Sequence, residues 1–303
     1  FYLCTNLASV TIPDGVTSIG ASTFRGCSSL SSINIPDSVT SIGRYAFYDC
    51  SSLTSMTIPY GVTSVENFTF TNCSSLTSVT IPDSVTLIDL SAFSNCISLT
   101  DITIPDSVTK MDYNAFIGCT SLISVTIGNG LNSIPDNAFY NCTSLTSVTI
   151  GNGLTVISDD VFNGCSSLTS VTFEGDVPSY RTDVFKDTPS HLTIYYDSRN
   201  DGWSDTFAGI PAVDTNPLTL LTFSLNGEGT EYSVSDCIET ASGSLDIPSI
   251  YNGLPVTSIG NSAFYDSPHL ISITIPESVT SIGQTAFLGC LNLTSITLPD
   301  SVI

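Results

Sequence analysis

The sequence predicts a repeat solenoid, built from stacked coils of 23 residues, on the evidence of two residue columns and one recurring strand pattern. Cysteine returns at every 23rd position from residue 4 to residue 165. Phenylalanine returns on the same step from residue 1 to residue 185 and again at 264 and 287, so eleven of the 15 phenylalanines share one column. A fixed period of this length indicates an array in which each coil packs on its neighbours.

Each coil is expected to begin with a short strand. The segment Leu76–Ile81 alternates apolar and polar residues and is rich in β-branched side chains, which is typical of a strand with one buried face. Pro82 then ends the strand because it has no N–H to donate to a ladder, and Asp83-Ser84 supplies a turn. The return segment around Phe93 is too short for a full helix.

One coil cannot fold alone, because its few apolar side chains are too little to offset the entropy lost on ordering. Stacking places each column above its copy at roughly 4.8 Å, the spacing of neighbouring strands. The result is a parallel sheet on one face and a continuous apolar interior. A slip of one residue would turn Val79 and Ile81 outward, so the columns also specify the register.

The repeat Leu-Thr-Ser-Val-Thr-Ile-Pro-Asp-Ser-Val-Thr-Ser-Ile-Gly-x-x-Ala-Phe-x-x-Cys-x-Ser closely resembles the BspA-like class of leucine-rich repeats. It fits Leu30–Ser52, with Ser-Ile-Asn in the strand, and with small changes most of residues 1–173 and 254–303. The resemblance implies a curved, right-handed leucine-rich-repeat solenoid with the sheet on its concave face and little helix. It also implies a secreted or cell-surface protein, often linked to adhesion, and it transfers no catalytic residue.

Breaks in the repeat divide the chain into three predicted parts. Residues 1–173 form the first repeat block, and residues 174–213 form a terminal repeat with a C-terminal cap around the sole tryptophan, Trp203. A cap is expected because an uncovered last coil exposes core and strand edge. Residues 214–303 begin with a hairpin at Asn226–Gly229 and continue into a second block. His191–Tyr196 is interpreted as the last strand of the first stack, displaced by one residue.

Composition narrows the classes of partner. The chain has 28 acidic and six basic residues, a formal charge of −22, which argues against binding to nucleic acid or to anionic lipid. Because 41% of the residues are hydrophobic and 11% are charged, the charge does not predict disorder. No stretch approaches the roughly 18–20 apolar residues that a membrane span needs, so no membrane insertion is expected within this chain.

The predicted ligand-binding surface is the outward face of the sheet, where polar side chains alternate with the buried ones. The candidate residues are Ser55, Thr57, Ser78, Thr80, Asp101, Thr103, Ser124, Thr126, Ser147 and Thr149. Solenoids commonly bind ligands through an extended face of this kind. Two other interpretations stay open: serine and threonine residues that simply suit a solvated strand and hydrogen-bond between coils, and a regular array that binds ice.

No cofactor or metal is expected. Neighbouring cysteines one coil apart are too widely spaced for a disulfide, whose Cβ atoms lie nearer 3.8 Å, and no Cys-x-x-Cys pair begins a zinc site. The cysteine column is therefore interpreted as buried free thiols. The turn carboxylates Asp14, Asp37, Asp83, Asp106, Glu277 and Asp300 form a broken column, but no calcium-loop motif accompanies them, so they are interpreted as solvated turn residues.

Aromatic side chains and histidines complete the candidates. Tyr45, Tyr48, Tyr60, Tyr113 and Tyr140 are scattered through the repeats, while Tyr195, Tyr196 and Trp203 gather near the predicted cap. Tyrosine and tryptophan are enriched at binding hot spots. The two histidines, His191 and His269, stand beside no nucleophile motif, and no catalytic motif occurs, so no enzyme activity is predicted.

The favoured function is a non-catalytic scaffold that is secreted or displayed on a cell surface and binds an extracellular protein or glycan through the sheet face. Two alternatives are a passive spacer that presents other domains and the repeat region of a larger enzyme.

Overall fold

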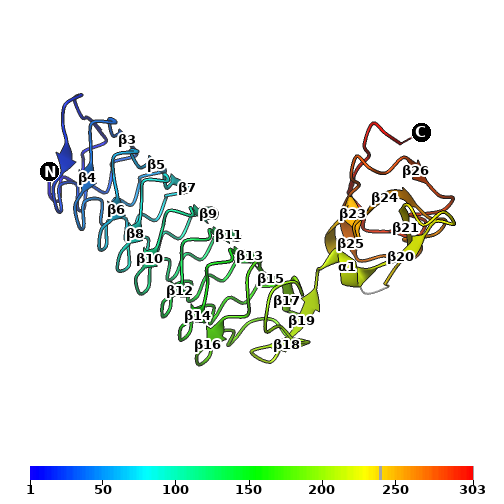
Figure 1. Ribbon diagram of the computed structural model, residues 1–303. Helices are drawn as coiled ribbons and strands as arrows, with labels where there is room; N and C mark the ends of the chain where they lie inside the picture. Colours follow the sequence, from blue (N-terminus) through cyan, green and yellow to red (C-terminus); the bar gives the residue numbers. More distant parts are fainter. Residues whose placement is uncertain (239–240, 303) are drawn as a thin grey trace. The chain divides into compact units, whose positions relative to one another are not determined.

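The computed structural model describes residues 1–238 and 241–302. The chain forms two compact units, each drawn in Figure 1. Unit 1 comprises Phe1–Tyr195 and Asn200–Val213, and unit 2 comprises Tyr196–Arg199 and Asp214–Ile303. Each unit has its own buried apolar cluster.

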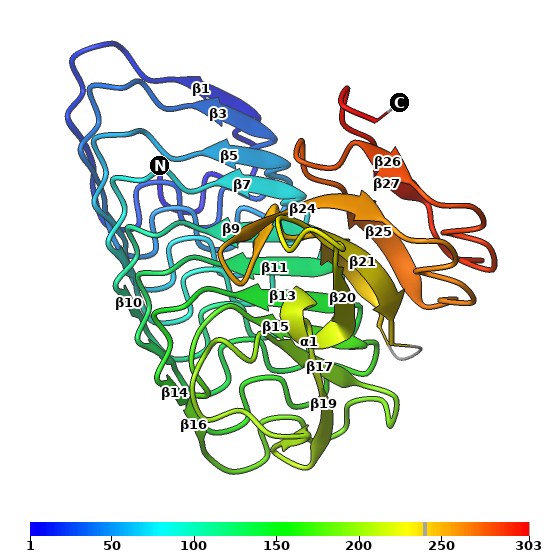
Figure 2. The same ribbon diagram turned by 45° about the vertical axis from the view of Figure 1, so that its right-hand side comes forward.

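Unit 1 is a solenoid in which every coil but the last contributes one strand to each of two parallel series (Figures 1 and 2); the last coil contributes a strand to the first series alone. The first series is β1 (Ser9–Thr11), β3 (Ser32–Asn34), β5 (Ser55–Thr57), β7 (Ser78–Thr80), β9 (Asp101–Ile104), β11 (Ser124–Ile127), β13 (Ser147–Ile150), β15 (Ser170–Phe173) and β17 (Thr193–Tyr196). The second is β2 (Ser18–Ile19), β4 (Ser41–Ile42), β6 (Ser64–Val65), β8 (Leu87–Ile88), β10 (Lys110–Met111), β12 (Ser133–Ile134), β14 (Val156–Ile157) and β16 (Ser179–Tyr180). The predicted solenoid with parallel strands and little helix is confirmed.

The phenylalanine column forms a stack of rings through the interior of unit 1. Successive rings lie nearly parallel, as in the pair Phe93 and Phe116, whose centroids are 5.1 Å apart with planes 5° apart. Both side chains are fully buried. Strand pairing keeps the 23-residue step, with Val125 opposite Val148 and Ile127 opposite Ile150. The apolar half of each strand therefore faces the same interior as the rings.

The cysteine column lies beside the rings and makes hydrogen bonds between coils. The thiol of Cys119 donates to the backbone oxygen of Phe93 in the preceding coil over 3.2 Å. The same bond recurs from Cys27, Cys50, Cys73, Cys96, Cys142 and Cys165, and in unit 2 from Cys290. All described cysteines are free thiols. The buried members of the column fill space as expected and also connect neighbouring coils. Cys4 in the first coil is exposed, so the prediction of a buried thiol was wrong at that position.

The end of unit 1 after β15 is covered by an irregular segment that contains the antiparallel strands β18 (Thr206–Phe207) and β19 (Ile210–Asp214). The Trp203 ring packs on Phe173 at 5.1 Å between centroids, and its indole N–H donates to the backbone oxygen of Gly175. This packing is what a cap requires. The strand β17 pairs with β15 at the ordinary 23-residue step, with Thr193 opposite Ser170, so the predicted displacement by one residue was wrong.

Unit 2 opens with the short helix α1 (Pro217–Leu220), followed by the antiparallel pair β20 (Leu221–Leu225) and β21 (Tyr232–Cys237). This pair confirms the predicted hairpin at Asn226–Gly229. The remaining strands are β22 (Gly243–Asp246), β23 (Ile250–Tyr251), β24 (Leu254–Ile259), β25 (Leu270–Thr274), β26 (Ser281–Ile282) and β27 (Ser295–Thr297). The pairing of β25 with β27 restores the 23-residue step.

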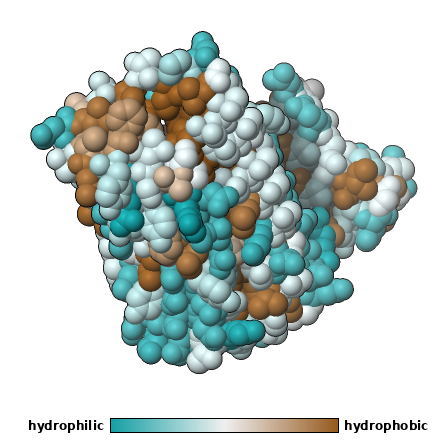
Figure 3. All heavy atoms as spheres, turned by 90° about the vertical axis from the view of Figure 1, so that its left-hand side faces the viewer, coloured by the Kyte–Doolittle hydropathy of each residue, from teal (hydrophilic) through white to brown (hydrophobic). Residues whose placement is uncertain are grey.

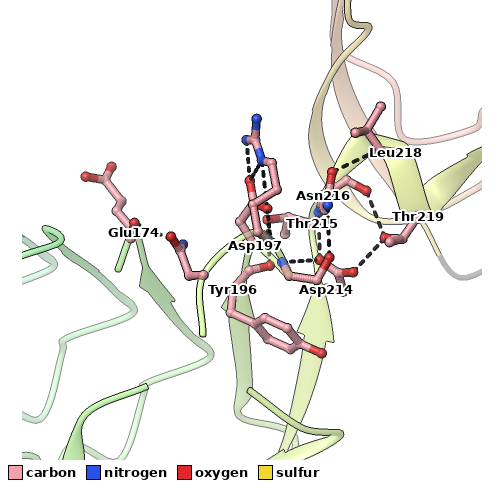
Figure 4. A network of polar contacts seen from close by, with 11 residues as sticks. Glu174, Tyr196, Asp197, Asp214, Thr215, Asn216, Leu218 and Thr219 are labelled. Atoms are coloured by element: carbon pink, nitrogen blue, oxygen red, sulfur yellow. Dashed lines mark hydrogen bonds and ion pairs between the residues drawn. The ribbon is translucent and has the colours of Figure 1, made fainter. Parts of the chain in front are cut away.

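A polar network ties the two segments of unit 2 that flank residues 200–213 (Figure 4). The carboxylate of Asp214 accepts hydrogen bonds from the backbone N–H groups of Ser198 and Asn216 and from the hydroxyl of Thr219. Thr215 adds a bond from its hydroxyl to the backbone oxygen of Tyr196. These contacts hold residues 196–199 against the start of α1, which Asn216 caps by accepting the Leu218 N–H over 3.0 Å.

The end of unit 1 that carries the first coil is apolar, and apolar side chains are visible there in Figure 3. Phe1 and Leu3 are exposed by 61% and 58%. Phe1, Val10, Ile12, Val16 and Phe24 line a shallow cavity of about 270 Å³ at this end.

Candidate functional site

The ten predicted ligand-binding residues lie on five consecutive strands of the first series, β5 to β13 (Figure 2). Ser55 stands opposite Ser78, and Thr57 opposite Thr80. Asp101, Ser124 and Ser147 form one row, and Thr103, Thr126 and Thr149 form the next. The structure therefore brings them into two parallel rows, because side chains at alternate positions of a strand point to the same face. We call these ten side chains the sheet face.

The side chains of the sheet face are solvent-accessible, whereas the residues between them are mostly buried. Strand β9 shows the alternation, with Asp101 and Thr103 exposed and Ile102 and Ile104 buried. The nine hydroxyl groups of the sheet face make no hydrogen bond to any other residue in the described part of the chain. Asp101 differs, since its carboxylate accepts a hydrogen bond of 2.9 Å from the Thr100 hydroxyl.

Other hydroxyl groups of unit 1, outside the sheet face, do form hydrogen bonds between coils. A threonine immediately before five of the strands, β5, β7, β9, β13 and β15, donates to a backbone oxygen one coil earlier, as Thr77 does to Thr54 over 3.0 Å. A serine in the turn does the same, as Ser84 does to Val62 over 2.9 Å. Further bonds of these kinds start from Ser38, Thr54, Thr100, Ser107, Thr146 and Thr169. Bonding between coils in unit 1 thus uses the flanking hydroxyls and leaves the nine of the sheet face unbonded to other described residues. The inter-coil bonds expected for the strand hydroxyls are therefore missing at these nine positions. In unit 2 the corresponding Ser272 does donate to the Ser244 hydroxyl over 2.7 Å.

The same face continues beyond the predicted residues to a tyrosine. Thr149 stands opposite Thr172, and Thr172 stands opposite Tyr195 on β17. The sequence interpretation assigned Tyr195 to the cap, although its spacing of 23 residues from Thr172 contained the signal. The row therefore ends in a half-buried aromatic side chain instead of a hydroxyl.

The buried members of the cysteine column offer no reactive group, whereas Cys4 is exposed. Burial raises the pKa of the Cys119 and Cys165 thiols to about 12, so these side chains stay protonated at neutral pH. A thiolate is the nucleophile and metal ligand. Across the described residues, His, Cys, Asp and Glu nowhere gather in threes or more as a metal site would require.

The turn carboxylates are exposed, and one of them has a structural bond: Asp106 accepts from the backbone N–H of Asn129 in the next coil over 2.7 Å. The two histidines are exposed and lie in different units. Of the scattered tyrosines, Tyr60 and Tyr113 are exposed by 70% and 52%, whereas Tyr45 and Tyr48 are half-buried and pack together at 5.7 Å.

Comparison with known proteins identifies the class to which this architecture belongs. The family model of the BspA type leucine rich repeat region matches residues 1–123, 88–206 and 243–303. These ranges cover most of the chain, so the chain belongs to the BspA-type leucine-rich repeat family. The resemblance seen in the sequence is confirmed, and leucine-rich repeats of this kind typically mediate protein interactions.

Solved structures of bacterial leucine-rich repeat proteins are similar to this chain. A leucine-rich repeat protein from Bacteroides ovatus is 27% identical, with a TM-score of 0.59 over 99% of this chain and 75% of the other. A leucine rich cell surface protein from Faecalibacterium prausnitzii is 30% identical, with a TM-score of 0.45 over 98% and 74%. The leucine rich repeat protein of T. pallidum is 30% identical, with a TM-score of 0.45 over 61% and 79%.

No curated protein matches this chain. Among residues 1–238 and 241–302, no helix has the length and apolar character that a membrane crossing requires.

Proposed function

We propose that the protein is a non-catalytic binding scaffold, secreted or displayed on a cell surface, that engages an extracellular protein or glycan through the sheet face. The single observation that carries the proposal is the set of unbonded hydroxyls. Hydroxyl groups that flank the strands donate to backbone oxygens of the preceding coil. The nine hydroxyl groups of the sheet face make no such bond and are free to bind a partner.

The shape and chemistry of this surface support a macromolecular partner. Its rows follow the strands β5 to β13, so it offers many weak polar contacts in a regular array instead of one pocket. Hydroxyls both donate and accept hydrogen bonds, which suits a polypeptide backbone or a sugar equally well. None of the ten side chains is basic, so the surface has no direct electrostatic attraction for a polyanion.

Family membership supports the general class, since repeat solenoids present extended binding surfaces. The relative from Faecalibacterium prausnitzii is described as a cell surface protein, which supports the proposed location. A passive spacer is the second candidate function, because an array that only holds other domains apart would need no ligand of its own.

The experiment compares two double variants on an array of glycans and extracellular-matrix proteins. Ser78→Lys plus Thr126→Lys places two long cations on the sheet face. Ile97→Lys plus Thr120→Lys adds the same two charges at exposed positions in the loops before β9 and β11 and serves as the control. We expect saturable binding that the first pair abolishes and the control retains. A complete lack of saturable binding by the unmodified protein, or equal loss in both pairs, would contradict the proposal and favour the spacer.

A further inference from the structure

An arginine surrounded by tyrosines lies away from the sheet face, on the return segments of the first coils of unit 1. The Arg25 guanidinium carbon lies over three rings, 5.7 Å from the centroid of Tyr2, 5.2 Å from that of Tyr45 and 4.8 Å from that of Tyr48. We call these four side chains the tyrosine–arginine cluster. Distances below about 6 Å are those of attractive cation–π contacts.

The repeat explains how the cluster forms. Tyr2, Arg25 and Tyr48 are each 23 residues apart, so they occupy one column on three consecutive coils. The guanidinium therefore has a tyrosine from the coil before and a tyrosine from the coil after. Tyr45 comes from the neighbouring column, with its ring tilted by 58° to that of Tyr48 and stacked on Phe68 at 4.9 Å.

Arg25 makes no ion pair within the described chain, although the sequence contains 28 carboxylates. Arg44 and Lys110 are likewise without an ion pair among the described residues, whereas Arg181 pairs with Asp159, Lys186 with Asp183 and Arg199 with Asp197. The Arg25 guanidinium also donates no hydrogen bond to the residues that the structure describes. A guanidinium has five N–H donors around its edge and can be stacked on its faces at the same time. Here the guanidinium lies over aromatic rings, and its N–H donors have no acceptor among the described residues.

Backbone conformation adds a second observation. Tyr45 and Phe68 occupy a position that is left-handed in coil after coil, with φ of 58° and 57°. Other coils place small polar residues there: Ser22, Ser91, Asn114, Asn137 and Asp160. A bulky aromatic residue is unfavourable in this region. These two coils therefore hold aromatic rings where asparagine would suit the backbone better, as is often found at functional sites.

We propose that the tyrosine–arginine cluster binds a carboxylate-bearing sugar, such as a uronic or sialic acid. The sugar carboxylate accepts two parallel hydrogen bonds from the edge of Arg25, the geometry in which arginine recognises carboxylates best. The apolar C–H face of the sugar ring packs on an exposed tyrosine, and Tyr2 is 57% exposed. An acidic peptide offers the carboxylate without a rigid ring whose C–H face could pack on tyrosine, so the three tyrosines favour the sugar.

The charge of the whole chain favours a small monoacid over a polyanion. With a formal charge of −22, the protein repels an extended anion at every point of approach. A single carboxylate held against Arg25 experiences less of this repulsion, because charges beyond a Debye length of about 8 Å are screened at physiological ionic strength.

The test uses isothermal titration of the whole chain with four probes: the methyl glycoside of N-acetylneuraminic acid, methyl glucuronide, methyl glucoside as the neutral sugar, and N-acetyl-aspartate amide as the acidic non-sugar. We expect at least one acidic sugar to bind and both other probes to bind far more weakly. Arg25→Gln should weaken that binding by about tenfold or more, as expected when a charge-assisted hydrogen-bond pair is lost.

The matched control is Arg44→Gln, which removes the same charge from an exposed arginine on the next coil without a ring over it in the described chain. It should leave the affinity unchanged, and Arg25→Lys should recover only part of it because lysine lacks the planar fork. A thermal midpoint shared by all variants shows that each one folds.

Equal binding of the neutral sugar or of the acidic amide, no binding of either acid sugar, or equal loss in Arg44→Gln would overturn the assignment. Ser78→Lys plus Thr126→Lys should not affect binding at this site, so the two proposals are tested independently of each other.

Discussion

At the scale of single residues, two residues of the repeat stabilise the packing between coils in different ways. The phenylalanine fills the interior. The cysteine three positions later donates its thiol proton to the backbone carbonyl of the phenylalanine in the preceding coil, as Cys119 does to Phe93. That carbonyl already accepts the N–H of Cys96, so the thiol uses its second lone pair. A sulfur hydrogen bond is weak alone, but it recurs in coil after coil.

The buried thiols should make the free energy of unfolding fall as the pH rises above 9. Burial raises the pKa of Cys119 from 9.0 to about 12, so its protonated form is favoured in the folded chain. Its contribution to stability is complete below pH 9 and is lost as the pH rises through 12. In that window one such thiol should lower the free energy of unfolding by about 1.4 kcal/mol per pH unit.

Denaturant unfolding of Cys119→Ala between pH 8 and pH 11 checks this prediction, because tyrosine and lysine titrations are common to both proteins and cancel in the difference. The variant should start less stable and lose stability less steeply above pH 9. Parallel pH profiles for the two proteins would show that this thiol ionises equally well in the folded state.

At the scale of elements, the turn after each strand controls how closely the coils approach. The turns after β11 and β13 read Gly-Asn-Gly where others read Pro-Asp-Ser or Pro-Asp-Gly. A Cβ atom added at Gly153 would lie 2.0 Å from the backbone oxygen of Asn129 in the preceding coil. Gly153 is therefore required for close approach.

Replacing Gly153 with alanine should lower the free energy of unfolding by about 1–3 kcal/mol, the usual cost of an overpacked position. Asn152→Ala is the matched control, since this exposed side chain lies next to Gly153 in the same turn. Chemical denaturation measures both variants. A stable Gly153→Ala protein would mean that the coils can separate locally without cost.

The sequence predicted these elements well because each depends on local periodicity. The alternation in Leu76–Ile81 was enough to place β7 and to say which side chains are buried. It could not say which hydroxyls are free, because Thr77 and Ser78 are alike in sequence and differ only in the carbonyl that the neighbouring coil presents. Nor did it reveal the cluster at Arg25, where the significance of Tyr2 and Tyr48 appears only once consecutive coils are superposed.

At the scale of the whole molecule, the chain has two separate cores. The cluster of unit 1 includes Phe93, and that of unit 2 includes Phe264, and the two clusters have no described residue in common. Repeat arrays derive their cooperativity from packing between adjacent coils. Because separate cores need not melt together, unfolding need not follow a single two-state transition.

Differential scanning calorimetry should therefore resolve two transitions, and buried phenylalanines should assign them. Phe93→Ala and Phe264→Ala each remove a fully buried ring, which typically costs about 3–5 kcal/mol. Phe93→Ala should lower the transition of unit 1 alone, and Phe264→Ala that of unit 2 alone. Tyr113→Ala, at a side chain that is 52% exposed, should change neither. A single transition lowered by both buried variants would show instead that the two units unfold as one cooperative array.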